Sequence, residues 1–178
     1  QSSIRAFEHA YGELINGTAK PIDESEISPV ASLPSLDSDI SGKVTIKPEL
    51  LEESVVLKLN GGLGTSMGLD KAKSLLKVKG EDTFLDLTAR QVSSMRAEFS
   101  RPKLKFMLMN SFNTSTDTLD FLSKYPEIVA DPNLELMQNK VPKVNKSDMK
   151  PAVWETNSNL EWCPPGHGDL YTALYGSG

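Results

Sequence analysis

Residues 54–68 have the sequence SVVLKLNGGLGTSMG, in which a β-prone run, Ser54–Asn60, leads directly into a cluster of glycines. Four glycines, Gly61, Gly62, Gly64 and Gly68, follow the expected end of the strand. Glycine lets the backbone adopt positive φ angles and approach an anion with no Cβ in the way. Consecutive amides in such a turn can point into one concavity and bind phosphate oxygens. The stretch therefore predicts a phosphate-binding turn, with a purely structural turn as the alternative.

The spacing of these glycines excludes two familiar phosphate-binding motifs. A P-loop needs a glycine, four residues and then Gly-Lys-Ser/Thr, and none of the four glycines begins that pattern. The dinucleotide fingerprint G-x-G-x-x-G fails as well, because from Gly62 its last position falls on Met67. What remains is G-G-x-G-T with a lysine, Lys73, a little further on.

Strand and helix signals alternate after the glycine cluster. Thr83-x-x-Asp86 predicts a capping box, and we expect one face of that helix to carry Phe84, Thr88, Val92, Met95 and Phe99. Further elements are expected as a strand at 103–110, a helix from Thr114-x-x-Asp117 to about Lys124, a strand at 134–138 and a short helix at 169–175. This alternation predicts an α/β fold with a mostly parallel sheet flanked by helices and right-handed crossovers. Such a sheet binds its ligand at the carboxyl ends of the strands, where both the glycine cluster and Gln138 are expected.

Composition limits the classes of function. The formal net charge of −5 argues against a general nucleic-acid binder, which usually needs a basic face. The single cysteine excludes an internal disulfide framework. No apolar stretch reaches transmembrane length and no signal segment opens the chain, so we expect no membrane partner. A cytoplasmic location is expected, with a peroxisome-like organelle as the alternative.

Two units are expected along the chain. Residues 1–50 comprise an N-terminal helix and an extended lead-in rich in Pro, Ser and Asp. Residues 51–178 are expected to form the first part of a nucleotide-binding catalytic domain. A parallel sheet would normally continue with another strand after the last expected helix, so we expect the chain to be a fragment.

Five segments together resemble the eukaryotic UDP-glucose pyrophosphorylase family. They are VVLKLNGGLGTSMG (55–68), KSLL (73–76), TFLDLTARQV (83–92), LMNSFNT (108–114) and PPGHGDLY (164–171). They occur in the family's order, and PPGHGD is much more specific than the glycine loop. The wider superfamily often has proline where this chain has Ala72, which bears on how Lys73 is presented.

The resemblance implies a Rossmann-like (GT-A-like) nucleotidyltransferase fold, incomplete at the C-terminus, and an enzyme that makes UDP-glucose and pyrophosphate reversibly from UTP and glucose 1-phosphate. Mg²⁺ would assist the departure of pyrophosphate after attack on the α-phosphate. Lys73 would be catalytic, and His167 would contact the sugar phosphate. The implied nucleotide contacts are Leu59, Asn60, Gly61, Gly62, Gly64, Thr65, Lys73, Gln138 and Gly166. Metal ligands are expected after Gly178, so the rest of the polypeptide would complete the site.

Each residue type suits its role and also has a structural alternative. Lys73 carries a permanent charge on a flexible stem but could be a surface lysine. The carboxamide of Gln138 can donate and accept at one edge of uracil, or it could cap a loop. His167 could donate to a phosphate oxygen or be satisfied by its own turn. For Asp169 we favour a structural role in the first turn of a helix over metal binding, and Cys163 has no expected partner to activate it.

Three functions remain open at this point. The first is the uridylyltransferase, with the 178-residue piece expected to be inactive alone. The second is a UDP-sugar pyrophosphorylase of other or broad sugar specificity. The third is a non-catalytic nucleotide-binding fragment. Trp154 and Trp162 are expected to be packing residues, either of which could wall the nucleotide pocket.

Overall fold

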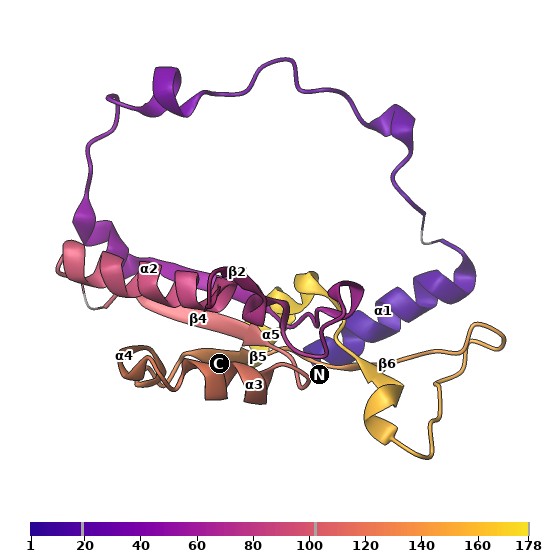
Figure 1. The fold of residues 1–178 in the computed structure, drawn as a ribbon. Helices are drawn as coiled ribbons and strands as arrows, with labels where there is room; N and C mark the ends of the chain where they lie inside the picture. The colour runs from indigo at the N-terminus through magenta and orange to yellow at the C-terminus, as the bar shows by residue number, and fades with distance from the viewer. Residues whose placement is uncertain (19, 102, 178) are drawn as a thin grey trace.

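The computed structural model describes residues 1–18, 20–101 and 103–177 and shows an α/β fold (Figure 1). Ala19, Pro102 and Gly178, the expected end of the second unit, lie outside the described residues. At the centre is a parallel sheet in which β4 (Lys105–Asn110) lies between β1 (Val55–Asn60) and β5 (Glu135–Met137). The three predicted strands and their parallel arrangement are confirmed.

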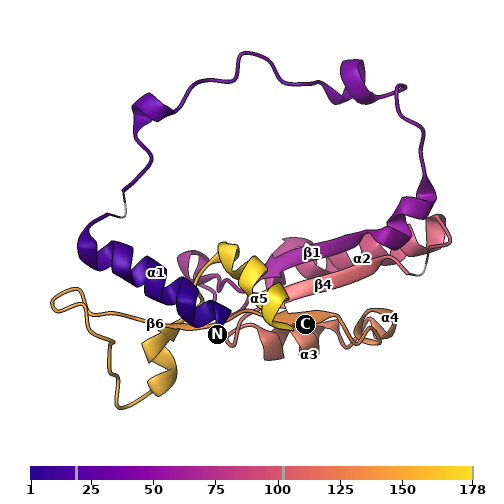
Figure 2. The ribbon, with the colours of Figure 1, turned by 180° about the vertical axis from the view of Figure 1, so that it is seen from behind.

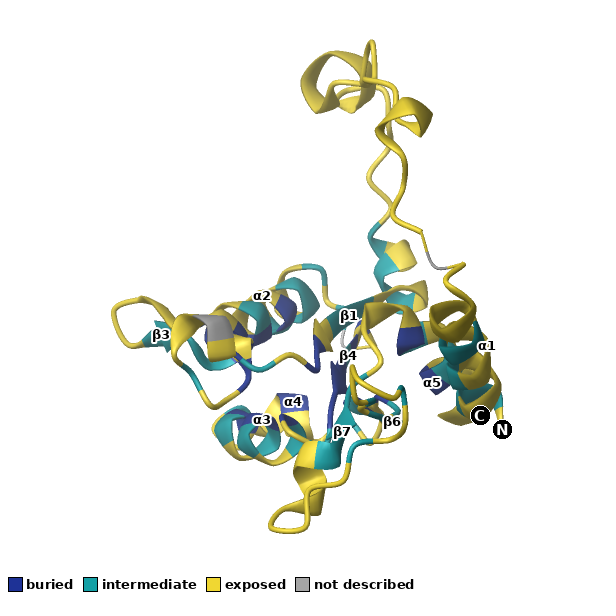
Figure 3. Cartoon of the chain, turned by 90° about the vertical axis from the view of Figure 1, so that its right-hand side faces the viewer, coloured by how far each residue is buried: buried dark blue, intermediate teal, exposed yellow. Residues whose placement is uncertain are grey.

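Helices cover both faces of this sheet. On one face lie α2 (Phe84–Glu98), α3 (Ser115–Leu122) and α4 (Pro126–Val129), and on the other lie α1 (Ser2–Asn16) and α5 (Leu170–Ser177), as the end-on view of Figure 3 shows. Seen from behind, α5 lies beside the start of α1, and α1 extends away from β1 and β4 (Figure 2). The main core between sheet and helices comprises Leu85, Ala89, Val92, Phe106, Leu108, Leu122, Ile128 and Leu134. A smaller core under α5 comprises Met109, Leu136 and Ala173.

The buried face of α2 differs from the predicted one. Leu85 and Ala89 are fully buried, whereas Phe84, the first residue of the predicted face, is 47% exposed. Of the predicted face only Val92 is fully buried. The buried residues Leu85, Ala89 and Val92 are spaced i, i+4 and i+7, so they lie on one face of the helix, and this face is rotated by about one residue from the predicted one.

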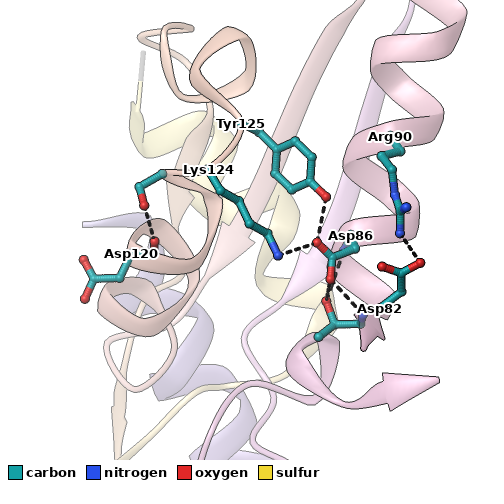
Figure 4. A network of polar contacts seen from close by, with 8 residues as sticks. Asp82, Asp86, Arg90, Asp120, Lys124 and Tyr125 are labelled. Atoms are coloured by element: carbon teal, nitrogen blue, oxygen red, sulfur yellow. Dashed lines mark hydrogen bonds and ion pairs between the residues drawn. The ribbon is translucent and has the colours of Figure 1, made fainter. Parts of the chain in front are cut away.

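A capping box begins α2, as predicted. The hydroxyl of Thr83 accepts from the backbone N–H of Asp86 at 3.1 Å, and Asp86 Oδ2 accepts from the backbone N–H of Thr83 at 2.8 Å. Asp86 Oδ1 accepts from Lys124 Nζ at 2.6 Å and from the Tyr125 hydroxyl at 2.7 Å (Figure 4). Burial raises the pKa of Asp86, but hydrogen bonds from Lys124, Thr83 and Tyr125 outweigh it and hold that pKa well below its usual range. One carboxylate thus ties the start of α2 to the segment after α3.

The second helix, α3, begins where Thr114-x-x-Asp117 predicted it, but the hydroxyl of Thr114 does not cap the helix. Thr114 Oγ1 accepts from the backbone N–H of Ser111 at 3.0 Å, and no side-chain cap bond is made at the start of the helix. The hydroxyl therefore closes the turn that connects β4 to α3.

The chain before β1 contains the predicted N-terminal helix, α1, followed by the predicted extended lead-in. The lead-in runs as a long arch away from the body and is exposed almost throughout (Figures 1 and 3). Two small antiparallel ribbons complete the structure: β2 (Lys77–Lys79) pairs with β3 (Asp82–Thr83), and β6 (Val141–Pro142) pairs with β7 (Trp162–Cys163). In residues 1–18, 20–101 and 103–177, no helix combines the length and the apolar character that crossing a bilayer requires.

Candidate functional site

Two adjoining recesses lie at the carboxyl ends of β1 and β5. The glutamine recess has a volume of about 320 Å³ and is lined by Gly61, Gly62, Leu63, Thr65, Asn113, Gln138, Pro164, Gly166 and His167. The lysine recess has a volume of about 200 Å³ and is lined by Lys58, Leu59, Asn60, Gly62, Lys73, Ser74 and His167. Gly62 and His167 line both recesses. All of the predicted site residues except Gly64 line one or both recesses. Segments far apart in the sequence therefore meet at the edge of the sheet where the topology predicts a ligand.

The glycine loop is closed on itself, and this closure positions Lys73. The backbone N–H of Gly64 donates to the carbonyl of Lys71 at 2.9 Å, and that of Lys73 donates to the carbonyl of Gly62 at 3.2 Å. Between them, Ala72 is fully buried with a φ of −53°, an angle that the ring of proline also adopts. Alanine in place of the superfamily's proline is therefore compatible with the same direction of the chain at Lys73.

Two glycines of the loop are required by close packing. A Cβ on Gly61 would lie 2.1 Å from Gln138 Oε1, and a Cβ on Gly64 would lie 2.7 Å from Leu69 Cβ. The glycine cluster is thus partly structural, as the alternative interpretation held, because Gly64 makes room for Leu69. At Gly61 the absent side chain instead makes room for Gln138, one of the predicted ligands of the nucleotide.

Gln138 is fixed between the sheet and the segment 164–168. Its backbone N–H donates to the carbonyl of Asn110 at 2.8 Å, and Nε2 donates to the carbonyl of Gly166 at 2.9 Å. The residue is only 6% exposed although it lines the glutamine recess. One N–H of the amide is used by Gly166, and a second remains for a ligand.

His167 stands on the turn that follows Gly166. Gly166 has a φ of +114° and a ψ of 177°, a conformation essentially confined to glycine. The next residue, His167, is exposed and forms the wall common to both recesses. This placement agrees with contact to a ligand rather than with a role in the core.

A ladder of polar side chains joins the three strands, from the last residues of β1 and β4 to the first residue of β5. Asn60 Nδ2 donates to Asn110 Oδ1 at 2.7 Å, and Asn110 Nδ2 donates to Glu135 Oε1 at 2.7 Å. Asn60 Nδ2 also lies 2.9 Å from Thr118 Oγ1 on α3. The side chain of Asn60, one of the predicted nucleotide contacts, is therefore hydrogen-bonded within the fold. It lines the lysine recess and holds β1 to β4 and α3 there.

The structural role that we favoured for Asp169 is confirmed. Its carboxylate accepts from the backbone N–H of Asn139 at 2.7 Å and from Asn139 Nδ2 at 3.0 Å, and it also bonds the hydroxyl of Thr172. Asp169 thereby holds the residue after Gln138 against the start of α5.

The tryptophans do not wall the site. Trp162 is partly buried, with Lys140 Nζ 4.9 Å above its ring, but Trp154 is 57% exposed and is not the packing residue that we expected. Tryptophan is usually buried because of its large apolar surface, and the open segment around Trp154 offers too little to cover it. Cys163 is partly buried, and its Sγ lies 3.8 Å from the carbonyl oxygen of Val141.

Sequence reasoning missed four polar residues at this site: Lys58, Ser74, Ser111 and Asn113. Ser111 donates its hydroxyl to the carbonyl of Gly61 at 2.8 Å and so orients the first peptide of the glycine loop. Asn113 lines the glutamine recess from the loop after β4. The segments KSLL and LMNSFNT contained the signal for three of them, because both follow predicted elements toward the ligand edge of the sheet.

The lysine recess is electropositive. Lys58 and Lys73 line it, and no acidic side chain lines either recess in the described part of the chain. Burial lowers the pKa of Lys58. Cations in a concave, partly desolvated site attract anions strongly, so the arrangement favours a phosphorylated ligand.

The described residues contain no group of three or more His, Cys, Asp or Glu side chains arranged to hold a metal ion.

A larger hollow of about 390 Å³ lies away from these recesses, between α1 and the β6 segment. Most of its lining is apolar, and the carboxylate of Asp169 on its wall is already hydrogen-bonded. It lacks the convergent polar groups that a site for a charged ligand needs.

Known proteins match this chain over most of its length. A model of the UTP–glucose-1-phosphate uridylyltransferase family matches residues 4–178. The UTP–glucose-1-phosphate uridylyltransferase of Solanum tuberosum is 37% identical over 180 residues, covering 97% of this chain and 37% of that protein. A UDP-glucose pyrophosphorylase mutant from Leishmania major, solved in complex with UDP-glucose, has a TM-score of 0.89 at 50% identity and covers 100% of this chain and 37% of that one. The crystal structure of a UDP-glucose phosphorylase from Trypanosoma brucei has a TM-score of 0.83 at 47% identity and covers 99% of this chain and 36% of that one. This chain thus spans little more than a third of the length of these relatives.

Proposed function

The chain belongs to the UTP–glucose-1-phosphate uridylyltransferase family, and on that premise we propose that it binds UTP in the synthesis of UDP-glucose and pyrophosphate from UTP and glucose 1-phosphate. A phosphate oxygen of glucose 1-phosphate attacks the α-phosphorus of UTP, and the bond to the leaving pyrophosphate breaks. The reverse reaction uses the same site. Because the chain spans 37% of its relatives' length, the reaction is proposed for the whole protein.

One observation carries this proposal: the predicted base ligand and the predicted phosphate ligand come together at one edge of the sheet. Gln138 lines one recess, Lys73 lines the other, and the recesses adjoin at Gly62 and His167. A nucleotide laid across Gly62 would place its base beside Gln138 and its phosphates toward Lys73. That order matches what uridylyl transfer requires.

The chemistry asks for alignment and for positive charge where negative charge builds up. Lys73 faces the charge that develops on the leaving phosphates, and the closed glycine loop holds its backbone in place. The carboxamide of Gln138 donates to and accepts from one edge of uracil. His167, at the junction, donates to the phosphate of the sugar phosphate.

Mg²⁺ and a cytoplasmic location are further parts of the proposal. The described residues contain no group of three or more His, Cys, Asp or Glu side chains that could hold a metal ion, so none of them is assigned to Mg²⁺. Metal ions commonly bridge the phosphate oxygens of a bound nucleoside triphosphate, and Mg²⁺ would enter as part of that substrate. The cytoplasmic location is supported by the single cysteine, which suits a reducing compartment.

Release of pyrophosphate from UTP and glucose 1-phosphate by the whole protein, of which this chain is expected to be one part, tests the function. Lys73→Ala should lower kcat about 10²- to 10³-fold, comparable to the loss of a transition-state donor. Lys79→Ala, at an exposed position on β2, is the matched control and should retain activity. Absence of pyrophosphate release, or equal activity of Lys73→Ala and the control, would refute the proposal. Comparing turnover of several sugar 1-phosphates would separate glucose specificity from broad specificity.

A further inference from the structure

The hydroxyl of Ser74 is a buried donor that lacks a partner among the described residues. Ser74 is 5% exposed, and its Oγ makes no hydrogen bond there. A buried hydroxyl without a partner is unfavourable, and native structures rarely leave one in place without a reason. Ser74 also lines the lysine recess, so a ligand in that recess is a candidate for the missing acceptor.

Lys58 is a second group at the recess that the proposed function leaves without a role. It lies on β1 opposite Leu108 of β4, and it faces the side of the sheet covered by α2 and α3. Lysine is seldom buried unless it is paired, yet Lys58 is only partly exposed and forms no ion pair with an acidic side chain in the described part of the chain. An anion in the recess would provide the missing counter-charge.

We propose that the lysine recess is a built site for the two terminal phosphates of the nucleotide, which leave as pyrophosphate, and that Ser74 and Lys58 are phosphate ligands beside Lys73. This inference rests on the proposed function and adds two binding residues to it. The Ser74 hydroxyl donates a hydrogen bond to a non-bridging phosphate oxygen. The ammonium group of Lys58 extends from the strand β1 and that of Lys73 from the loop, and both pair with the negative charge of the phosphates.

The chemistry of the recess selects this class of ligand. Its lining offers two ammonium groups, a hydroxyl and a histidine without an opposing carboxylate, which suits a compact polyanion and disfavours a cation or an apolar group. Because Gly62 and His167 are shared with the glutamine recess, one triphosphate chain can continue from the base site into this one.

The test is calorimetric titration of the protein with inorganic pyrophosphate and, separately, with UMP, which lacks the terminal phosphates. Ser74→Ala and Lys58→Met should each weaken pyrophosphate binding about tenfold, the factor expected when one hydrogen bond to a charged group is lost. Binding of UMP should stay within about twofold of wild type. Ser94→Ala on α2 and Lys105→Met on β4 are matched controls at exposed positions and should change neither affinity.

The outcomes separate this inference from the proposed function. Wild-type affinity for pyrophosphate in Ser74→Ala and Lys58→Met, or an equal loss of pyrophosphate and UMP binding, would overturn the inference alone. A wild-type protein that binds pyrophosphate but not UMP would contradict the uridine site and leave the phosphate site intact. Urea unfolding adds a second readout: removing a hydroxyl that lacks a partner should not destabilise Ser74→Ala, whereas a hydroxyl that serves the fold would lower the unfolding midpoint when removed.

Discussion

Replacing Gly61 by alanine tests whether the glycine loop and the glutamine recess form one unit. The new Cβ would lie 2.1 Å from Gln138 Oε1 and 3.5 Å from Ser111 Cβ. The second distance is an ordinary contact, so the whole conflict concerns the amide of Gln138. The clash is relieved by a shift of the Gln138 amide rather than of Gly61. Gly61 directly follows β1, and its carbonyl is held by the hydroxyl of Ser111.

The size of the effect follows from the distances. To restore an ordinary contact of at least 3.4 Å, Gln138 Oε1 must retreat by more than 1 Å. The bond from Nε2 to the carbonyl of Gly166 is 2.9 Å long, and a shift of that size breaks it. An amide left unpaired at this buried position costs about 1–3 kcal/mol. If Gln138 holds the base, the affinity for UMP should fall by about tenfold to a hundredfold.

Urea unfolding and calorimetric titration with UMP measure the two effects. Gly62→Ala is the matched stability control, because its Cβ would meet no atom within 4 Å. We expect it to unfold within about 0.5 kcal/mol of wild type. A Gly61→Ala protein with wild-type stability and wild-type affinity for UMP would show that Gln138 is neither fixed by Gly61 nor needed for the base.

Three further predictions concern the framework around the site. Asp86→Ala should lower the free energy of unfolding by about 3 kcal/mol, because the Thr83 backbone N–H and the Tyr125 hydroxyl lose their acceptor; Asp82→Ala, which removes an exposed ion pair, should cost under about 1 kcal/mol in the same urea assay. The pKa of Asp86 is lower in the folded state than in the unfolded chain, so its contribution is complete above about pH 5 and is lost as the pH falls further; urea midpoints measured from pH 6 to pH 3 should therefore fall more steeply in wild type than in Asp86→Asn. Gly166→Ala forces a side chain into a conformation suited to glycine and should destabilise the protein by about 1–3 kcal/mol, and unchanged unfolding would show that the turn adapts freely.

The sheet and the position of the ligand edge were predictable because they depend on local signals. Alternating strand and helix segments specify parallel crossovers, and a glycine cluster after the first strand marks the edge where ligands bind. Gln138 was expected at the end of a predicted strand, and the family resemblance assigned it to the base. The sheet and its ligand edge need only the order of elements along the chain, which the sequence records directly, whereas the role of Gln138 came from the resemblance.

The missed features depend on which side chains meet in space. The face of α2 that packs on the sheet contains Leu85 and Ala89. The apolar pattern of the sequence does not show that Phe84, which lies next to Leu85, stays exposed. Ser74 gives no sequence signal of burial, and Lys58 looks like the polar position of a half-exposed strand. Their importance becomes visible only in the three-dimensional structure. Among the described residues, the hydroxyl of Ser74 has no acceptor and the ammonium group of Lys58 has no acidic partner, and both residues line the lysine recess.

The polar ladder across the strand ends explains how a loop-based site can be accurate. The glycine loop starts directly after the ladder residue Asn60, and Gln138 follows Met137, which ends the short strand that the ladder residue Glu135 begins. Hydrogen bonds from Asn60 to Asn110 and from Asn110 to Glu135 fix the strands relative to one another at that level. Loops held at their base in this way begin from set positions, and less conformational freedom remains to be lost when the ligand binds. Under the proposed function, the amide of Asn60 would contribute to nucleotide binding chiefly by determining where the glycine loop begins.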